Sequence, residues 1–273
     1  MAGIIAGAAL VAGGGRGLGR AIAERLARDG FAVGILARTV DEVDETVQAI
    51  RDQGGKAEGF AADVLDEIGF EKASKRFLDW TGGVCDALVC AIGRLKAIGP
   101  LALVSSREWR LDLETSLIGT HLAILSVLPN LRQSPKGTIQ VLVGPGHHGE
   151  LANASAYATA QAGLVRFVET IDRELRPDGP FVYAINPGLV PTRLIQHVLD
   201  GREGRRYLPR FTEAFAEGKE VGSEVVAEMS AWLVAERPAE LRGRVVAAPA
   251  TPAILETRLA RVLAEDLNVL RLR

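Results

Sequence analysis

The sequence has little excess charge and few cysteines. Its 32 basic and 34 acidic residues nearly cancel, which argues against nucleic acid or another polyanion as a partner. Its two cysteines, Cys85 and Cys90, are too few for a disulfide framework and do not form a zinc-binding pattern, so we expect no metal site and a reducing, cytoplasmic setting. The partners that this composition favours are a small-molecule ligand or another protein.

Long apolar runs are also scarce. Residues 1–5 carry no basic segment of the kind that begins a signal peptide. The most apolar long stretch, residues 117–128, is interrupted by Thr120, His121 and Ser126, which favours a buried helix over a membrane span. We therefore expect no membrane partner and a soluble intracellular protein.

What the sequence does have is enough apolar material for one large core. The 273 residues are 48% hydrophobic and 24% charged, and a single domain of this length is ordinary for an α/β architecture. We expect residues 1–273 to form one dinucleotide-binding domain.

A glycine-rich turn follows the first apolar run, residues 9–12. Its glycines are spaced as Gly13-x-x-x-Gly17-x-Gly19, with Gly14 and Gly15 between them, so it is not the G-x-G-x-x-G fingerprint. Such a turn lets the backbone approach a ligand closely, and the next helix offers unpaired N–H groups to a phosphate. The alternative is a loop that is glycine-rich for steric reasons alone.

Strand and helix patterns alternate along the rest of the chain. Expected strands lie at 31–36, 57–62, 86–91, 138–143, 181–185 and 244–248, and expected helices at 18–28, 40–50, 68–80, 105–128, 152–176 and 223–234. This order predicts a parallel sheet covered by helices on both faces, with ligands beyond the carboxyl ends of its strands. Residues 191–222 look like an irregular insertion, and residues 253–273 a helical tail.

The anchored positions resemble the short-chain dehydrogenase/reductase family over residues 8–248. They are the glycine turn, Asp63-Val64, Gly93 after the fourth strand, Tyr157 on the fifth helix, and Pro187-Gly188-Leu189-Val190-Pro191-Thr192. The resemblance implies a doubly wound, Rossmann-like α/β fold with seven strands in the order 3-2-1-4-5-6-7. It also implies a nicotinamide dinucleotide across the strand ends.

The resemblance assigns a set of residues to the cofactor. Asp63 is expected to accept a hydrogen bond from the adenine, while Thr192 and the Pro187-Gly188 turn hold the nicotinamide carboxamide. The full set of expected cofactor residues is Gly13, Gly15, Arg16, Gly17, Leu18, Gly19, Arg38, Asp63, Val64, Gly93, Gln161, Pro187, Gly188 and Thr192.

Charge at the end of the second strand favours NADP over NAD. The position where an acidic residue would bind the ribose 2′-hydroxyl of NAD carries Ala37, and Arg38 follows it. Arg16 in the glycine turn is a second cation, and a guanidinium matches the geometry of a phosphate. The alternative is that both arginines are solvated surface charges.

The catalytic residues depart from the family pattern of Asn, Ser, Tyr and Lys. Tyr157 is present, but the lysine position four residues later is Gln161, the serine position is Gly144 and the asparagine position is Ser116. Without a neighbouring ammonium the phenol pKa is expected to stay near its reference value of about 10. Gln161 can still bind a ribose hydroxyl but supplies no charge.

Two histidines follow Gly144 on the same loop. Either His147 or His148 could shuttle a proton or bind a carbonyl near neutral pH, and we include both with Tyr157 as candidate catalytic residues. The alternatives are a solvated loop for the histidines and inherited packing for Tyr157.

Three functions fit this pattern. The first is an NADP(H)-dependent oxidoreductase acting on a carbonyl or alcohol of a small molecule, with atypical catalytic residues. The second is a catalytically silent, cofactor-binding scaffold or subunit, and the third is a redox-neutral enzyme on the same fold. The resemblance implies a homodimer or homotetramer, with a mixed oligomer as an alternative, and we expect the 191–222 insertion to cover the substrate.

Overall fold

A seven-stranded parallel sheet forms the centre of the molecule. In the computed structural model, which describes residues 7–271, the strands run in the order β3-β2-β1-β4-β5-β6-β7, so the expected order and fold class are confirmed. The strands are β1 (Gly7–Ala12), β2 (Phe31–Ala37), β3 (Lys56–Ala61), β4 (Ala87–Cys90), β5 (Thr138–Leu142), β6 (Phe181–Asn186) and β7 (Val245–Ala247).

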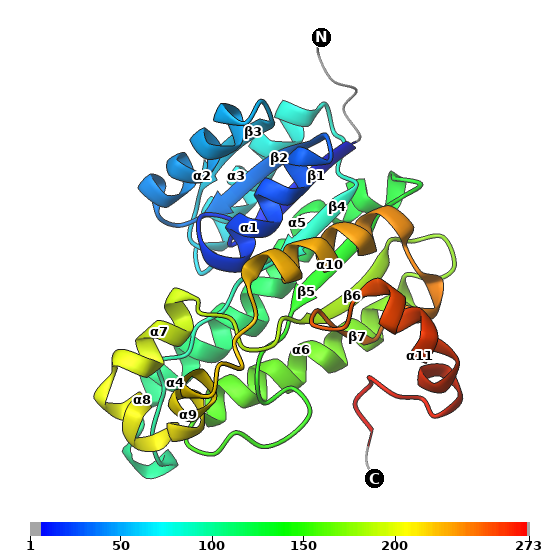
Figure 1. The fold of residues 1–273 in the computed structure, drawn as a ribbon. Helices are drawn as coiled ribbons and strands as arrows, with labels where there is room; N and C mark the ends of the chain where they lie inside the picture. The colour runs from blue at the N-terminus through cyan, green and yellow to red at the C-terminus, as the bar shows by residue number, and fades with distance from the viewer. Residues whose placement is uncertain (1–6, 272–273) are drawn as a thin grey trace.

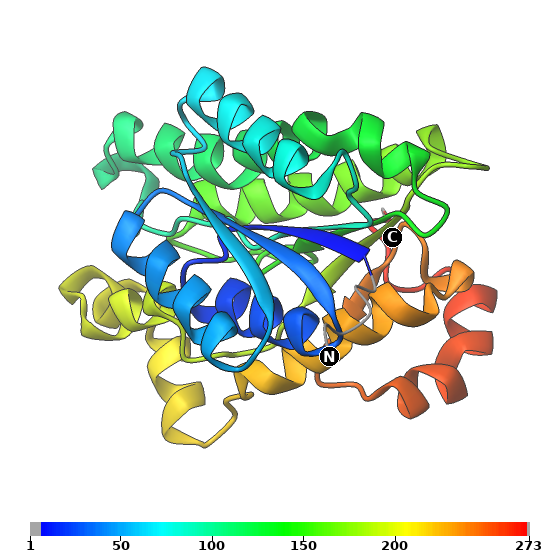
Figure 2. The same ribbon diagram turned by 90° about the horizontal axis from the view of Figure 1, so that it is seen from above.

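Helices cover both faces of this sheet (Figures 1 and 2). They are α1 (Gly17–Arg28), α2 (Val40–Asp52), α3 (Glu67–Thr81), α4 (Ser106–Leu113), α5 (Gly119–Gln133), α6 (Ser155–Glu174), α7 (Arg193–Asp200), α8 (Arg202–Tyr207), α9 (Pro209–Ala216), α10 (Ser223–Glu236) and α11 (Pro252–Ala264), with short turns η1 (Leu101–Leu103), η2 (Glu114–Ile118) and η3 (Ala239–Leu241).

The alternation of side chains along each strand divides the core into two halves. Ala9 and Val11 of β1 pack with the apolar faces of α1, α2 and α10, whereas Ala8 and Leu10 pack with those of α3, α5 and α6. The central strand β1 is therefore apolar on both faces, as a strand buried between two helix layers requires. The unbroken apolar runs in the sequence have this cause.

The long helix expected at residues 105–128 is interrupted. Its chain forms α4, one π turn at η2 and then α5. By length and composition alone, residues 106–133 are long and apolar enough to cross a membrane, because an 18-residue stretch within them has a mean hydropathy of 1.3. This stretch is longer than the apolar segment 117–128 identified from the sequence. Its apolar residues Ala123, Val127 and Leu131 nevertheless pack against the sheet in the core.

The segment 191–222 was expected to be irregular and is instead largely helical. It forms α7, α8 and α9, which Figure 1 shows in yellow, gathered to one side of the sheet. The segment contributes Ile195 and Val198 of α7, Leu208 between α8 and α9, and Phe211 of α9 to a third apolar cluster that also contains Tyr157. Helices of six to eight residues are too short to show a clear period, so their stability comes from this packing.

The expected tail at residues 253–273 contains α11, whose Leu255 packs in the same half of the core as α10. The final two residues of that tail, like residues 1–5 considered above, lie outside the described part of the chain.

Phe77 of α3 is expected to be one of the main stabilising side chains. It is fully buried, with its ring centroid 6.0 Å from that of Phe60 in an edge-to-face arrangement. Replacing Phe77 with alanine should lower the free energy of unfolding by about 3–5 kcal/mol, because a large cavity opens in the core. The matched change Ile68→Ala, on the same helix at a position 66% exposed, should alter it by less than about 0.5 kcal/mol. Urea unfolding measures both, and equal effects would contradict this assignment.

Candidate active site

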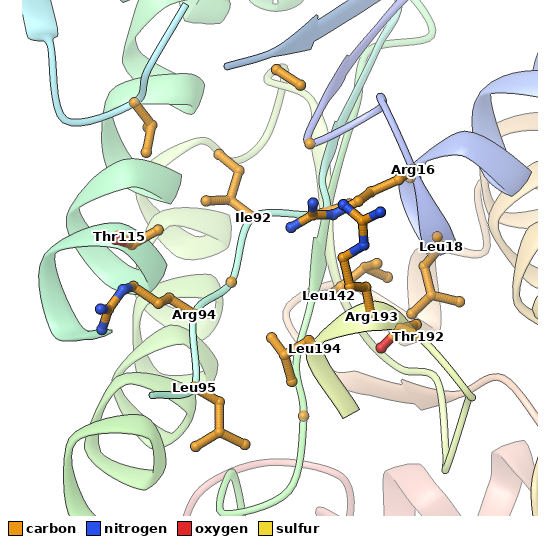
Figure 3. Close-up of a pocket in the computed structure, with 18 of the residues that line it drawn as sticks. Arg16, Leu18, Ile92, Arg94, Leu95, Thr115, Leu142, Thr192, Arg193 and Leu194 are labelled. Atoms are coloured by element: carbon orange, nitrogen blue, oxygen red, sulfur yellow. The ribbon is translucent and has the colours of Figure 1, made fainter. Parts of the chain in front are cut away.

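One cleft runs along the carboxyl ends of the strands (Figure 3). Its volume is about 710 Å³, within the range typical of small-molecule and cofactor sites. Every residue expected to bind the cofactor lines it, and so does Tyr157. The sequence positions 13 to 192, dispersed along the chain, are thus brought to one surface.

The glycine turn is a cradle that side chains would fill. A Cβ atom on Gly13 would lie 2.4 Å from the carbonyl oxygen of Ala91, and one on Gly19 would lie 2.1 Å from the carbonyl oxygen of Gly13. Both glycines are therefore required by close approach of the backbone to itself. Gly17 has a φ of +55°, a left-handed conformation that favours glycine.

The N-terminus of α1 opens into this cradle without a cap. Arg16 is the N-cap residue but its side chain makes no capping hydrogen bond, and the first turn holds no acidic residue. Among residues 7–271, the N–H groups of Gly17, Leu18 and Gly19 have no hydrogen-bond partner. Unpaired N–H groups and the positive end of the helix dipole fit a dinucleotide phosphate.

Three arginines and one carboxylate occupy the end of the cleft near β2. Arg16 and Arg193 both donate to Oε1 of Glu42, at 2.8 and 2.7 Å. Arg38 is exposed and lines the same region. Sequence reasoning named Arg16 and Arg38 but missed Glu42 and Arg193, although Arg193 directly follows the Thr192 position that it did name.

The remaining cofactor candidates line the two walls of the cleft. Asp63 Oδ1 accepts a hydrogen bond from Leu65 N at 3.0 Å, and Val64 packs against Gly119. Gly93 lies on the loop after β4, facing Leu194. On the opposite wall, a φ of +75° shapes the turn at Gly188.

Thr192 has a structural role that the sequence did not predict. Its hydroxyl caps α7 by accepting from Ile195 N at 3.4 Å. The family threonine is therefore also the point at which the segment containing α7 to α9 is attached to the cleft wall.

At the end of β5, Gly144 lies in contact with both Tyr157 and Gln161. Gly144 N donates to Oε1 of Gln161 at 2.7 Å. A Cβ atom on Gly144 would lie only 2.1 Å from the hydroxyl oxygen of Tyr157. The Tyr157 hydroxyl thus occupies the space that a side chain at the family's serine position would need.

The environment of Tyr157 opposes ionisation. The residue is 6% exposed and packs among Leu95, Ile98 and Ile195. Burial, and secondarily the negative charge of Asp112, raises the pKa of the phenol well above its ordinary value. The sequence argument predicted a pKa near the reference; the structure moves it further from neutrality because burial adds to the loss of the lysine.

Asp112 is the centre of a buried polar network that sequence reasoning missed. It accepts hydrogen bonds from Lys96 N and Ala97 N at 2.9 and 2.8 Å and forms an ion pair with Arg94. Arg94 also pairs with Glu108. Burial raises the pKa of Asp112, while these donors oppose that shift. Because Arg94 and Asp112 are 18 residues apart, no local pattern pointed to the pair.

The two histidine candidates lie outside the residues that line the cleft. His147 is buried, and its Nδ1 lies 2.8 Å from the carbonyl oxygen of Gly144. Its Nε2 lies 3.1 Å from Nδ1 of His148. Burial lowers the pKa of His147, so the ring is neutral at pH 7. The structure therefore brings His147 next to Gly144 and His148 next to His147, and neither ring lines the cleft.

Ser116, at the family's asparagine position, lies in the π turn η2. It is fully buried, and its hydroxyl accepts from Arg94 N at 3.2 Å. Its side chain thus holds the loop after β4 in place.

Comparison with known proteins identifies the family. The family model described as short chain dehydrogenase matches residues 7–203, and the fold and cleft are those of a nucleotide-binding α/β oxidoreductase. The chain belongs to the short-chain dehydrogenase family, whose members are oxidoreductases that act on carbonyl or alcohol groups with a nicotinamide cofactor.

Individual relatives cover most of the chain. It is 34% identical over 198 residues to the short-chain reductase protein NovJ of Streptomyces niveus, covering 72% of this chain and 74% of the relative. It is 29% identical to the 3-oxoacyl-[acyl-carrier-protein] reductase FabG of Aquifex aeolicus, covering 87% and 93%. A solved structure of an actinorhodin polyketide ketoreductase variant with NADPH superposes with a TM-score of 0.80 at 26% identity, covering 90% and 97%.

The contact between Gly144 and Tyr157 makes a testable prediction. Gly144→Ser should lower the free energy of unfolding by about 1–3 kcal/mol, because the new side chain overpacks against the phenol. Combining it with Tyr157→Phe should recover part of that loss, since the nearest atom is removed while the ring carbon Cζ remains 3.1 Å from the Cβ position. Denaturant unfolding of the four variants gives the coupling. Additive effects would show that Tyr157 does not occupy this space.

Proposed function

We propose that this protein is an NADP(H)-dependent oxidoreductase that reduces a carbonyl group of a small molecule to an alcohol, with an atypical catalytic site. The observation that carries the proposal is the placement of the Tyr157 hydroxyl and the Gln161 amide in the same cleft as the glycine cradle. The reductases and the ketoreductase among its relatives support the direction of the reaction.

Different residues of the cleft are proposed to bind different parts of the cofactor. The unpaired N–H groups of α1 and the glycine turn take the pyrophosphate, and Asp63 with Val64 lies at the adenine. Gln161 Oε1 is held by Gly144, which leaves its Nε2 hydrogens for a ribose hydroxyl. Pro187, Gly188 and Thr192 hold the nicotinamide end, with Gly93 on the opposite wall.

NADP is the proposed form of the cofactor. Arg16 and Arg38 place two guanidinium groups where β2 ends, and Ala37 supplies no carboxylate there. A planar guanidinium binds a phosphate through two parallel hydrogen bonds. The NADPH in the similar ketoreductase structure agrees with this choice.

Tyr157 is proposed as the proton donor. A reduced nicotinamide, when bound, supplies the hydride to the carbonyl carbon. Tyr157 Oη gives its proton to the carbonyl oxygen, which becomes the alcohol hydroxyl. A phenol whose pKa is raised stays protonated throughout the physiological range, so the side chain is in the donating form. The reverse reaction needs the phenolate, which this environment disfavours.

The catalytic role predicted for His147 and His148 stays a prediction, and their contacts support an indirect form of it. His147 binds the carbonyl of Gly144, whose N–H binds Gln161. We propose that the two rings position the loop that carries Gly144 and Gln161.

The surroundings of the site support two further proposals. Helices α7 to α9 of residues 191–222 share an apolar cluster with Tyr157 and are proposed to cover the substrate. On α5 and the adjoining turn, Ile118 and Leu125 are exposed apolar side chains, which supports a homodimer or homotetramer through this face. A cytoplasmic setting is proposed from the two free, buried cysteines.

Tyr157→Phe tests the proposed reaction. With NADPH and a panel of ketones and aldehydes, turnover should fall about 100-fold or more, because the proton donor is removed. NADPH binding, followed by its fluorescence, should change less than about twofold, since other residues hold the cofactor. Tyr183→Phe is the matched control, because Tyr183 is a buried tyrosine of β6 that does not line the cleft. Binding without turnover on the whole panel would instead favour a silent scaffold or a redox-neutral enzyme.

Arg38→Ala tests the choice of cofactor. Loss of one charge-assisted phosphate contact should weaken NADPH binding about tenfold and leave NADH binding unchanged. Arg28→Ala, at the far end of α1 and exposed, controls for the change in net charge. Equal affinity of the unaltered protein for both cofactors would refute the NADP assignment.

A further inference from the structure

A carboxylate stands among the arginines that face the phosphate end of the cleft. Oε1 of Glu42 accepts from Arg16 Nη1 at 2.8 Å and from Arg193 Nη1 at 2.7 Å. All three residues line the cleft, and Figure 3 shows the side chains of Arg16 and Arg193 pointing toward one another. The two guanidinium groups therefore converge on one anionic point.

Arg193 reaches this point from the other wall. It is the first residue of α7, directly after the capping residue Thr192. The Cγ2 atom of Thr192 lies 3.7 Å from the position of a Cβ on Gly17. Arg193 thus stands beside the glycine turn while belonging to the segment that packs on Tyr157.

Glu42 is held more firmly than the arginines that bind it. It lies in the first turn of α2, where a negative charge is favoured by the helix dipole, and its side chain is 19% exposed. The Thr46 hydroxyl bonds both the Gly15 and Glu42 carbonyl oxygens, which ties α2 to the glycine turn. Arg193 is 71% exposed, so its bridge to Glu42 is weak and readily exchanged.

We propose that Arg193 is a phosphate-binding residue for the dinucleotide, and that Glu42 competes with the phosphate for Arg193 and Arg16. This rests on the dinucleotide binding proposed above and adds a residue that the family motif does not contain. A phosphate offers more acceptor oxygens and more negative charge than one carboxylate oxygen, and so it takes the two guanidinium groups in preference.

The exchange of Glu42 for a phosphate at Arg193 also affects α7, which belongs to the segment proposed to cover the substrate. Leu194 and Ile195, the next two residues of α7, belong to the apolar cluster around Tyr157. A phosphate that binds Arg193 therefore secures the start of α7 on the cofactor side while the rest of the helix packs on the proton donor.

The test is a binding cycle with NADPH and NADH, followed by nicotinamide fluorescence, on the full chain. Arg193→Ala should weaken NADPH binding about fivefold to tenfold, the loss of one partly exposed charged contact. Glu42→Gln should tighten NADPH binding by a similar factor, because it frees Arg16 and Arg193 for the phosphate. When Arg193 is also replaced by alanine, the gain should be smaller, because only Arg16 is then freed. Arg210→Ala, an exposed arginine of α9 outside the cleft, is the control and should stay within twofold.

The second cofactor identifies the phosphate that is bound. A loss confined to NADPH assigns Arg193 to the 2′-phosphate, and an equal loss for NADH assigns it to the pyrophosphate; either supports the proposal. Unchanged binding of both by Arg193→Ala, or the same gain from Glu42→Gln with and without Arg193, overturns it while the proposed function stands. Failure of the unaltered protein to bind either dinucleotide overturns both. Circular dichroism confirms that each variant is folded.

Discussion

The hydrogen bond from Gly144 N to Gln161 Oε1 determines the arrangement of the candidate active site. A lysine at position 161 has no acceptor and could not make this bond. The bond joins the end of β5 to α6, one turn from Tyr157. Because Gly144 has no side chain, the phenol hydroxyl can lie in the space beside it. The departures at positions 144 and 161 thus form one consistent packing arrangement, in which each change fits the other.

This arrangement gives the site an unusual charge balance. The family lysine would place a positive charge beside the phenol, whereas here the buried carboxylate of Asp112 acts on Tyr157 with a negative charge. The positive charge of Arg94 is taken up by Asp112 and Glu108. Burial and charge therefore act in the same direction and keep the proton on Tyr157. In the proposed reduction, Tyr157 would release this proton to the strongly basic oxygen that forms when a carbonyl is reduced.

Local patterns in the sequence predicted the alternating strands and helices, the parallel sheet and the glycine turn. The strand order and most of the residues that line the cleft came from the resemblance to the short-chain dehydrogenase/reductase family. The helices α7 to α9 were missed because Gly201, Gly204 and Gly218 interrupt the helical pattern of the sequence. These helices are stabilised by packing in the apolar cluster that contains Tyr157. The bridge between Glu42 and Arg193 joins residues 151 positions apart. Such contacts depend on tertiary packing, and a single sequence carries no periodicity that indicates them.

The two ends of the cleft are connected through one short helix. Thr192 caps α7, Arg193 pairs with Glu42 beside the glycine turn, and Ile195 belongs to the apolar cluster that contains Tyr157. Residues 192–195 therefore contact both the glycine-turn end of the cleft and the cluster around Tyr157. A rigid helical turn cannot shift at one end without moving the other. A phosphate bound to Arg193, as proposed above, would therefore also act on the burial of Tyr157, which raises the pKa of the phenol.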